Sequence, residues 1–143
     1  MITTIMKDIE RIKNIDEMSI RKSASRDNIE VLKRWISQNI KEDLWIREYE
    51  SLLKETDGLD FNGLVIYNAR ADDKNNGLIA ANEIWYENEW QRSYLFFGDS
   101  SISWYCLDID NNYFLELDKP SGDIMEQYNS FNEMIKNAMN SVL

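Results

Sequence analysis

The segment DIDNN at residues 108–112 places carboxylate and amide side chains at the first, third and fifth positions of a candidate calcium-binding loop. The rest of the loop pattern is missing. The sixth position needs a glycine for a sharp turn and is Tyr113, and the twelfth needs a bidentate glutamate and is Lys119. Tyr113 also begins an apolar, strand-like run. The segment therefore predicts a polar hairpin turn, and we expect no metal ligands in it.

Catalytic side chains are equally hard to assemble. Cys106 is the only cysteine and the chain has no histidine, so a cysteine nucleophile would lack its usual base. The same two counts exclude Ser-His-Asp chemistry and the common zinc sites. Carboxylate pairs such as Glu87 with Glu89 could do acid–base work, but with 26 Asp and Glu residues such pairs are a weak signal. We expect a protein that is not an enzyme, with no catalytic residue, no metal and no cofactor.

Charge is the stronger indication. The net charge is -10, and residues 1–50 carry ten basic and ten acidic residues, whereas residues 51–143 carry six basic and sixteen acidic ones. Nucleic acids and anionic membranes need basic density on the protein, so neither is an expected ligand. A basic protein surface is the natural complement of the acidic part.

Composition bounds the architecture. The 143 residues with one proline and five glycines predict a single domain over 1–143 without a linker. The first residues are charged within seven positions and form no signal-type apolar region, and no window approaches the roughly 18 apolar residues of a membrane span. We expect a cytoplasmic protein that is a monomer or a weak homodimer.

Apolar periodicity predicts an α+β fold. Helices are expected over 3–15, 28–39, 42–55 and 128–142, and a strand over 61–67. A polar loop follows at 69–77, and residues 78–90 are ambiguous but could contain a short helix. Two turn signals divide residues 94–118 into three runs, which predicts an antiparallel meander with strands near 93–98, 102–109 and 112–117. The whole is an antiparallel sheet of about four or more strands, flanked by N-terminal helices and a C-terminal helix.

Three parts of the chain together resemble one family. They are the helix over 42–55 leading into Asp57-Gly58 and Phe61-Asn62-Gly63; Phe97-Gly98-Asp99-Ser100 followed by Trp104, Tyr105 and the turn at Asp108; and Ser130-Phe131-Asn132-Glu133-Met134-Ile135. Their order and spacing are similar to the SUKH superfamily, in its YrhA-like bacterial branch, over roughly residues 40–140. The resemblance implies an antiparallel sheet flanked by helices, and it supplies no catalytic residues. It also implies a function, because many bacterial members are immunity proteins that bind and neutralise a polymorphic toxin, often a nuclease. Others are general protein-interaction modules.

Aromatic residues indicate where a partner would bind. Trp104 lies at an apolar-periodic position, as do Trp35 and Trp45, and we expect all three in the core. Trp85, Tyr86 and Trp90 fall within six residues and cannot all face inward, so at least one is expected at the surface, where aromatics ringed by charge are typical of binding hot spots. The predicted partner-binding residues are Asp72, Asp73, Trp85, Tyr86, Glu87, Glu89, Trp90, Asp99, Asp108 and Asp110.

These expectations favour an immunity protein that binds a cognate toxin through an acidic face and so covers a basic toxin surface. The alternative is a scaffold or regulatory module of the same fold that has no toxin partner.

Overall fold

The structure, a computed structural model, describes residues 2–143. Its helices are α1 (Ile2–Ile15), α2 (Arg26–Asn39), α3 (Arg47–Glu55), α4 (Leu78–Trp85) and α5 (Phe131–Asn140), with short 3₁₀ turns η1 (Glu17–Ser19) and η2 (Glu89–Ser93). Its strands are β1 (Leu59–Phe61), β2 (Leu64–Ile66), β3 (Tyr94–Asp99), β4 (Ser103–Asp108), β5 (Tyr113–Asp118) and β6 (Ile124–Tyr128). None of the helices in this range is long and apolar enough to span a bilayer.

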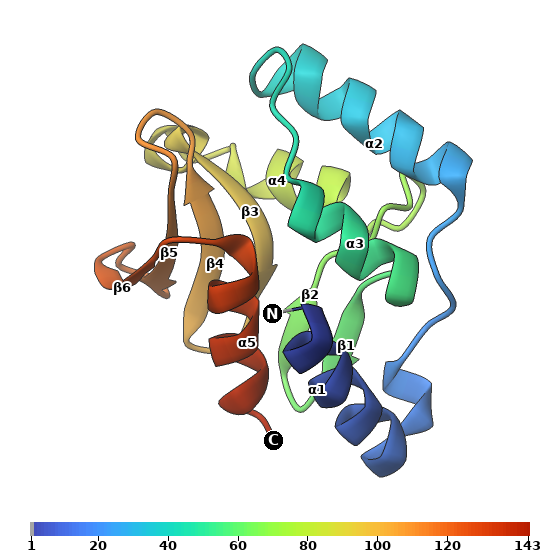
Figure 1. The fold of residues 1–143 in the computed structure, drawn as a ribbon. Helices are drawn as coiled ribbons and strands as arrows, with labels where there is room; N and C mark the ends of the chain where they lie inside the picture. The colour runs from blue at the N-terminus through green and yellow to red at the C-terminus, as the bar shows by residue number, and fades with distance from the viewer. Residues whose placement is uncertain (1) are drawn as a thin grey trace.

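All six strands form one antiparallel sheet in chain order, β1-β2-β3-β4-β5-β6. Helices α1, α3 and α5 lie together beside this sheet, and α4 lies near β3 (Figure 1). The predicted α+β class, with N-terminal helices, a C-terminal helix and consecutive antiparallel pairing of the meander, is confirmed. The polar loop over 69–77 is also found between β2 and α4.

The predicted strand over 61–67 is wrong, because the chain turns back within it. Asn62 and Gly63 have φ of 49° and 84°, and Phe61 pairs with Leu64 across this two-residue loop. Positive φ at both central residues is the requirement of a type I′ hairpin turn, which Asn-Gly meets at low steric cost. The segment is therefore a hairpin of β1 and β2.

Two helices begin three or more residues later than predicted. The last helix begins at Phe131 rather than 128, after Ser130, whose hydroxyl accepts a hydrogen bond from the backbone N–H of Glu133 at 3.1 Å. The preceding residues form the unpredicted strand β6. In addition, α3 begins at Arg47 and not near 42, after an extended residue, Ile46.

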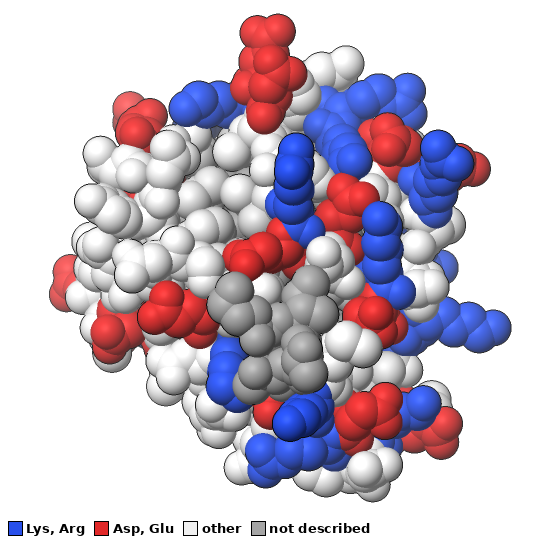
Figure 2. Space-filling view, in the orientation of Figure 1, with Lys and Arg blue, Asp and Glu red and all other residues white. Residues whose placement is uncertain are grey.

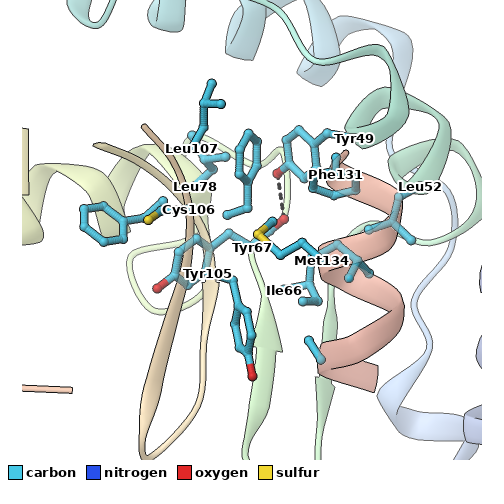
Figure 3. Close-up of a cluster of buried hydrophobic side chains, with 14 of the residues drawn as sticks. Tyr49, Leu52, Ile66, Tyr67, Leu78, Tyr105, Cys106, Leu107, Phe131 and Met134 are labelled. Carbon is cyan, nitrogen blue, oxygen red and sulfur yellow. Dashed lines mark hydrogen bonds between the residues drawn. The ribbon is translucent and has the colours of Figure 1, made fainter. Parts of the chain in front are cut away.

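Three aromatic rings form the centre of the core between the sheet and the helices. The centroids of Tyr49, Phe97 and Phe131 lie 5.0 to 5.6 Å apart, at tilted or edge-to-face angles. The hydroxyl of Tyr49 is fully buried and donates to the backbone oxygen of Tyr67 at 2.7 Å (Figure 3), and burial raises its pKa well above the ordinary value. This cluster fastens α3 and α5 to the sheet.

Of the three tryptophans predicted in the core, one is buried there and two are not. Trp104 is only 5% exposed, and Cys106 is fully buried, as expected for strand residues of the core. Trp35 and Trp45 are only partly buried and pack at the margin of the core, so their placement inside it is wrong.

The ambiguous segment over 78–90 contains α4 and the start of η2, and a buried asparagine fixes its position. The side-chain amide of Asn82 donates to the backbone oxygens of Leu78 and Phe96 at 2.8 and 2.9 Å, and its oxygen accepts from the N–H of Phe96 at 2.8 Å. The β2–β3 pairing joins Val65 with Asp99 and Ile66 with Gly98 and does not reach Phe96. The Asn82 side chain therefore provides hydrogen-bond partners for the backbone of β3 where β2 no longer does.

Candidate functional site

Three indole rings meet where α4, η2 and β4 approach one another. Trp85 ends α4, Trp90 lies in η2 and Trp104 lies in β4. The ring centroid of Trp104 is 5.5 Å from that of Trp85 and 5.7 Å from that of Trp90, at interplanar angles of 75° and 69°. Such edge-to-face pairs are favourable for aromatic quadrupoles. Trp104 is buried, whereas Trp90 is 41% exposed, so the group reaches the surface.

A lysine ammonium lies against these rings. The Nζ of Lys119 is 2.7 Å from Oδ2 of Asp99 and 3.1 Å from the backbone oxygen of Ser100. It also lies 5.4 Å from the ring centroid of Trp85 and 5.7 Å from that of Trp104, within the range of cation–π attraction. We call this group the aromatic–carboxylate site. Its members are Trp85, Trp90, Trp104, Asp99 and Lys119.

Neighbouring residues set the orientation of the rings. The Nε1–H of Trp85 donates to the hydroxyl of Tyr67 at 3.2 Å. Burial and the nearby carboxylate of Asp99 raise the pKa of that hydroxyl, so it stays protonated. The ring of Trp90 lies against the turn that contains Gly122. A Cβ on Gly122 would lie 2.6 Å from this ring, so glycine is needed for the ring to take this position.

The predicted partner-binding residues Trp85, Trp90 and Asp99 are thus brought together. Glu87 and Glu89 lie between the first two and are exposed. Tyr86 is only half-buried, but its hydroxyl donates to the backbone oxygen of Tyr94, so it serves mainly to join α4 to β3.

Asp72 and Asp73 lie apart from this site, in the loop before α4. The carboxylate of Asp73 accepts hydrogen bonds from the side chain of Asn68 at 2.8 Å and from the backbone N–H groups of Asn75 and Asn76 at 3.0 and 2.9 Å. Burial opposes ionisation, but these bonds outweigh it and lower the pKa of Asp73. Its carboxylate organises the loop, while Asp72 is exposed.

Asp108 and Asp110 lie at the turn between β4 and β5. The Oδ1 of Asp108 accepts from the N–H groups of Asp110 and Asn111 at 3.1 and 3.2 Å, which closes the turn. The predicted polar hairpin turn is therefore confirmed. Tyr94 pairs with Asp108, whereas Asp99 pairs with Trp104, so this turn lies at the opposite end of β4 from the aromatic–carboxylate site.

Lys119 was not among the predicted residues. It belongs to a Lys-Pro-Ser-Gly run, which indicates only a break in the chain. Asn82, which positions Trp85 one helical turn away, was also missed. A signal for it exists, because a single amide within the apolar run LIAANEIW suggests a buried polar contact.

Acidic residues dominate the part of the chain that carries the site. Residues 83–128 contain ten Asp and Glu residues against only two basic ones, Arg92 and Lys119. Lys119 is paired with Asp99, and the Nε of Arg92 donates to the backbone oxygen of Tyr86 at 2.9 Å. On the face shown in Figure 2, Lys and Arg gather over the helices, whereas the charged side chains over the sheet are mostly acidic.

A hollow of about 510 Å³ lies elsewhere on the molecule, between α2 and α3, and is lined by Lys33, Asp43, Trp45, Arg47, Glu50, Ser51 and Lys54. Glu50 accepts from Lys33 at 3.0 Å, from Lys54 at 3.1 Å and from Nε1 of Trp45 at 2.7 Å. The bond from Lys33, joined by those from Lys54 and Trp45, lowers the pKa of Glu50 to about 2. A carboxylate with so low a pKa is a poor general acid or base near neutral pH.

Replacing Glu50 by glutamine is expected to destabilise the protein in a pH-dependent way. The pKa of Glu50 is lower in the folded state than its usual 4.5, so its ionised form stabilises the fold. That contribution is complete above about pH 5 and is lost as the pH falls towards 2. Urea denaturation from pH 7 to 2 should show the two proteins converging in acid. The exposed Glu10→Gln variant should differ little from wild type throughout, and a Glu50→Gln deficit that persists unchanged at pH 2 would contradict the assignment.

Comparison with known proteins bears on the fold. No protein-family model matches the chain, and no curated protein sequence matches it. The structure is similar to the crystal structure of a protein from Pseudomonas syringae pv. tomato, with a TM-score of 0.61 and 12% sequence identity over 87% of this chain and 90% of that chain. A likeness at this identity shows that the two chains share a fold, and function has to be argued from the site.

Proposed function

We propose that this chain is a non-enzymatic immunity protein that binds a protein toxin with a basic surface and neutralises it by stoichiometric binding. The observation that carries the proposal is the aromatic–carboxylate site, where two indole rings and a carboxylate hold an ammonium group at the edge of an acidic surface. Partly exposed tryptophans beside charged groups are the usual anchors of protein interfaces. The resemblance to SUKH proteins supports immunity as the role of this binding.

Charge supports the choice of a basic partner. The ten acidic residues of 83–128 are offset only by Arg92 and Lys119, and both of these already have internal partners. Such an acidic surface attracts a basic protein at long range and so raises the association rate. Enzymes that act on nucleic acids need a basic surface for the phosphates. A protein that covers this surface would exclude the substrate without doing any chemistry.

Reversing charge at Glu87 and Glu89 is expected to slow association by about tenfold or more at low ionic strength, because steering of this size is common for charged partners. The deficit should shrink as salt rises, since the Debye length is about 8 Å at physiological ionic strength. The partner to be tested is the protein encoded by the neighbouring gene, obtained by co-expression and capture. Its association rate is then measured by surface plasmon resonance at several NaCl concentrations. The matched control reverses charge at Glu10 and Glu17, which lie in the electrically neutral first part of the sequence.

Trp90→Ala in the same series should act on dissociation instead, because an anchor contributes after docking. An association rate that ignores both salt and the Glu87/Glu89 reversal would show that the acidic face is not the binding surface. Failure of any neighbouring protein to bind would favour the scaffold or regulatory alternative.

A further inference from the structure

Resting on the proposed function, we propose that the aromatic–carboxylate site receives a lysine side chain of the partner, and that Lys119 occupies the place of that lysine in the free protein. The ammonium of Lys119 has two oxygen acceptors, on Asp99 and Ser100, and two indole rings within cation–π range. The molecule thus displays the chemistry that the site accepts, which is a primary ammonium at the end of an alkyl chain.

The site requires a cation. The side chain of Asp99 is 18% exposed, and its carboxylate lies near the protonated hydroxyl of Tyr67, which accepts the hydrogen bond of the Trp85 indole. A carboxylate withdrawn this far from water is costly to leave without a positive partner. Removal of one ammonium therefore favours entry of another.

Lys119 can leave without unfolding its surroundings. Its backbone N–H donates to the backbone oxygen of Ile102 at 3.0 Å, so the main chain stays anchored when the side chain rotates away. The side chain is 24% exposed and has a flexible four-carbon stem. Exchange of Lys119 for a lysine of the partner preserves the hydrogen bonds and the cation–π contacts. The exchange therefore adds little affinity, and its main effect is to select partners that present a lysine at this point.

A second lysine–tryptophan–carboxylate group serves as a comparison. The Nζ of Lys33 lies 5.3 Å from the ring centroid of Trp45 and 3.0 Å from Glu50. Glu50 also binds Lys54 at 3.1 Å, so it keeps a positive partner when Lys33 is removed. At the aromatic–carboxylate site, no other lysine or arginine of residues 2–143 lies within ion-pair distance of Asp99. Of these two carboxylates that lie beside a lysine and a tryptophan, only Asp99 loses its one ion-pair partner when that lysine is removed.

The first test uses n-butylammonium, which reproduces the four-carbon stem and ammonium of lysine. Lys119→Ala should show a saturable rise in melting temperature and a change in tryptophan fluorescence with n-butylammonium chloride, compared with NaCl of equal ionic strength and with n-butanol. Wild type should not respond, because its own lysine is present at a high effective concentration. Lys119→Met, which fills the space with an apolar group, Lys33→Ala, and Lys119→Ala combined with Asp99→Asn should not respond either.

A cooperatively folded Lys119→Ala protein that ignores n-butylammonium overturns the proposal. A response to n-propylguanidinium as large as that to n-butylammonium overturns the assignment to lysine.

The second test uses the partner protein itself. Lys119→Ala should dissociate from it roughly tenfold more slowly than wild type, because the internal competitor is gone, and Asp99→Asn should dissociate faster. Equal dissociation of all three proteins from a bound partner overturns the docking role while the proposed function stands. If no basic partner is found, the proposed function fails, and the n-butylammonium measurement still decides whether the site accepts a lysine-like cation.

Discussion

Asn82→Ala is expected to lower the free energy of unfolding by about 2–6 kcal/mol, because it leaves two buried backbone groups of β3 without partners. The N–H and the oxygen of Phe96 both bond to the Asn82 side chain, which is fully buried. Each buried polar group left unsatisfied costs roughly 1–3 kcal/mol. Because β2 does not reach this part of β3, and β4 lies on the opposite edge, no strand on the side of Asn82 can take over the two bonds.

Asn39→Ala is the matched control. Like Asn82, Asn39 donates its side-chain amide to the backbone oxygen four residues earlier, here that of Trp35 at 2.9 Å, but Asn39 is exposed at the end of α2. Its replacement should change the free energy of unfolding by less than about 0.5 kcal/mol. Urea denaturation followed by circular dichroism measures both variants. A loss below about 1 kcal/mol for Asn82→Ala would show that α4 is not held to β3 by this amide.

The central strands were predictable because their residues are buried on both faces of the sheet. Strands β3, β4 and β5 each consist of a nearly continuous apolar run, and the polar turns between them are short. The predicted bounds differ from the observed ones by at most one residue at each end. A long buried run bounded by turn residues leaves little freedom for another structure.

Edge and hairpin strands carry a weaker signal. Four of the five residues of β6 are exposed, including Ile124 and Met125, so the strand shows no alternation of buried and exposed positions. Strands β1 and β2 have three residues each, and without attention to the Asn-Gly turn they merge into one apolar segment. The sequence pattern failed for these strands because β1 and β2 are too short to show a clear alternation and β6 buries only one of its residues.

The aromatic–carboxylate site was predictable only in part, because sheet register assembles it. The sequence pointed to Trp85 and Trp90 because these aromatic residues fall within six positions and are flanked by acidic residues. The position of Lys119 depends on two pairings, Asp99 with Trp104 and Trp104 with Leu117, which bring the residue two places beyond Leu117 close to Asp99. Register is set by contacts over the whole sheet, and a shift of one residue would turn each side chain to the other face.

The same contacts that stabilise the fold also position the candidate site. Asn82 fixes α4, α4 fixes Trp85, and the hydroxyl of Tyr67 fixes the direction of that ring. A substitution at the site can therefore weaken binding by loosening the fold. Functional tests need variants that separate these two effects, and Trp104 allows such a separation.

Trp104→Ala is expected to lower the free energy of unfolding by about 3–5 kcal/mol, because it removes a large ring that is 5% exposed and contacts two other indoles. Denaturant melts giving a loss below about 1 kcal/mol would show that the ring is not part of the core.

Trp104→Phe should cost much less. The Nε1 of Trp104 is buried and has no hydrogen-bond partner within residues 2–143, so phenylalanine leaves no group of the protein unsatisfied. Phenylalanine keeps an aromatic face, but it attracts a cation less strongly than indole does. In the Lys119→Ala background, Trp104→Phe should therefore remain folded and bind n-butylammonium more weakly. A Phe variant that is as unstable as the Ala variant would mean that the indole makes a hydrogen bond in solution. An unchanged affinity for n-butylammonium would mean that the Trp104 ring takes no part in holding the cation.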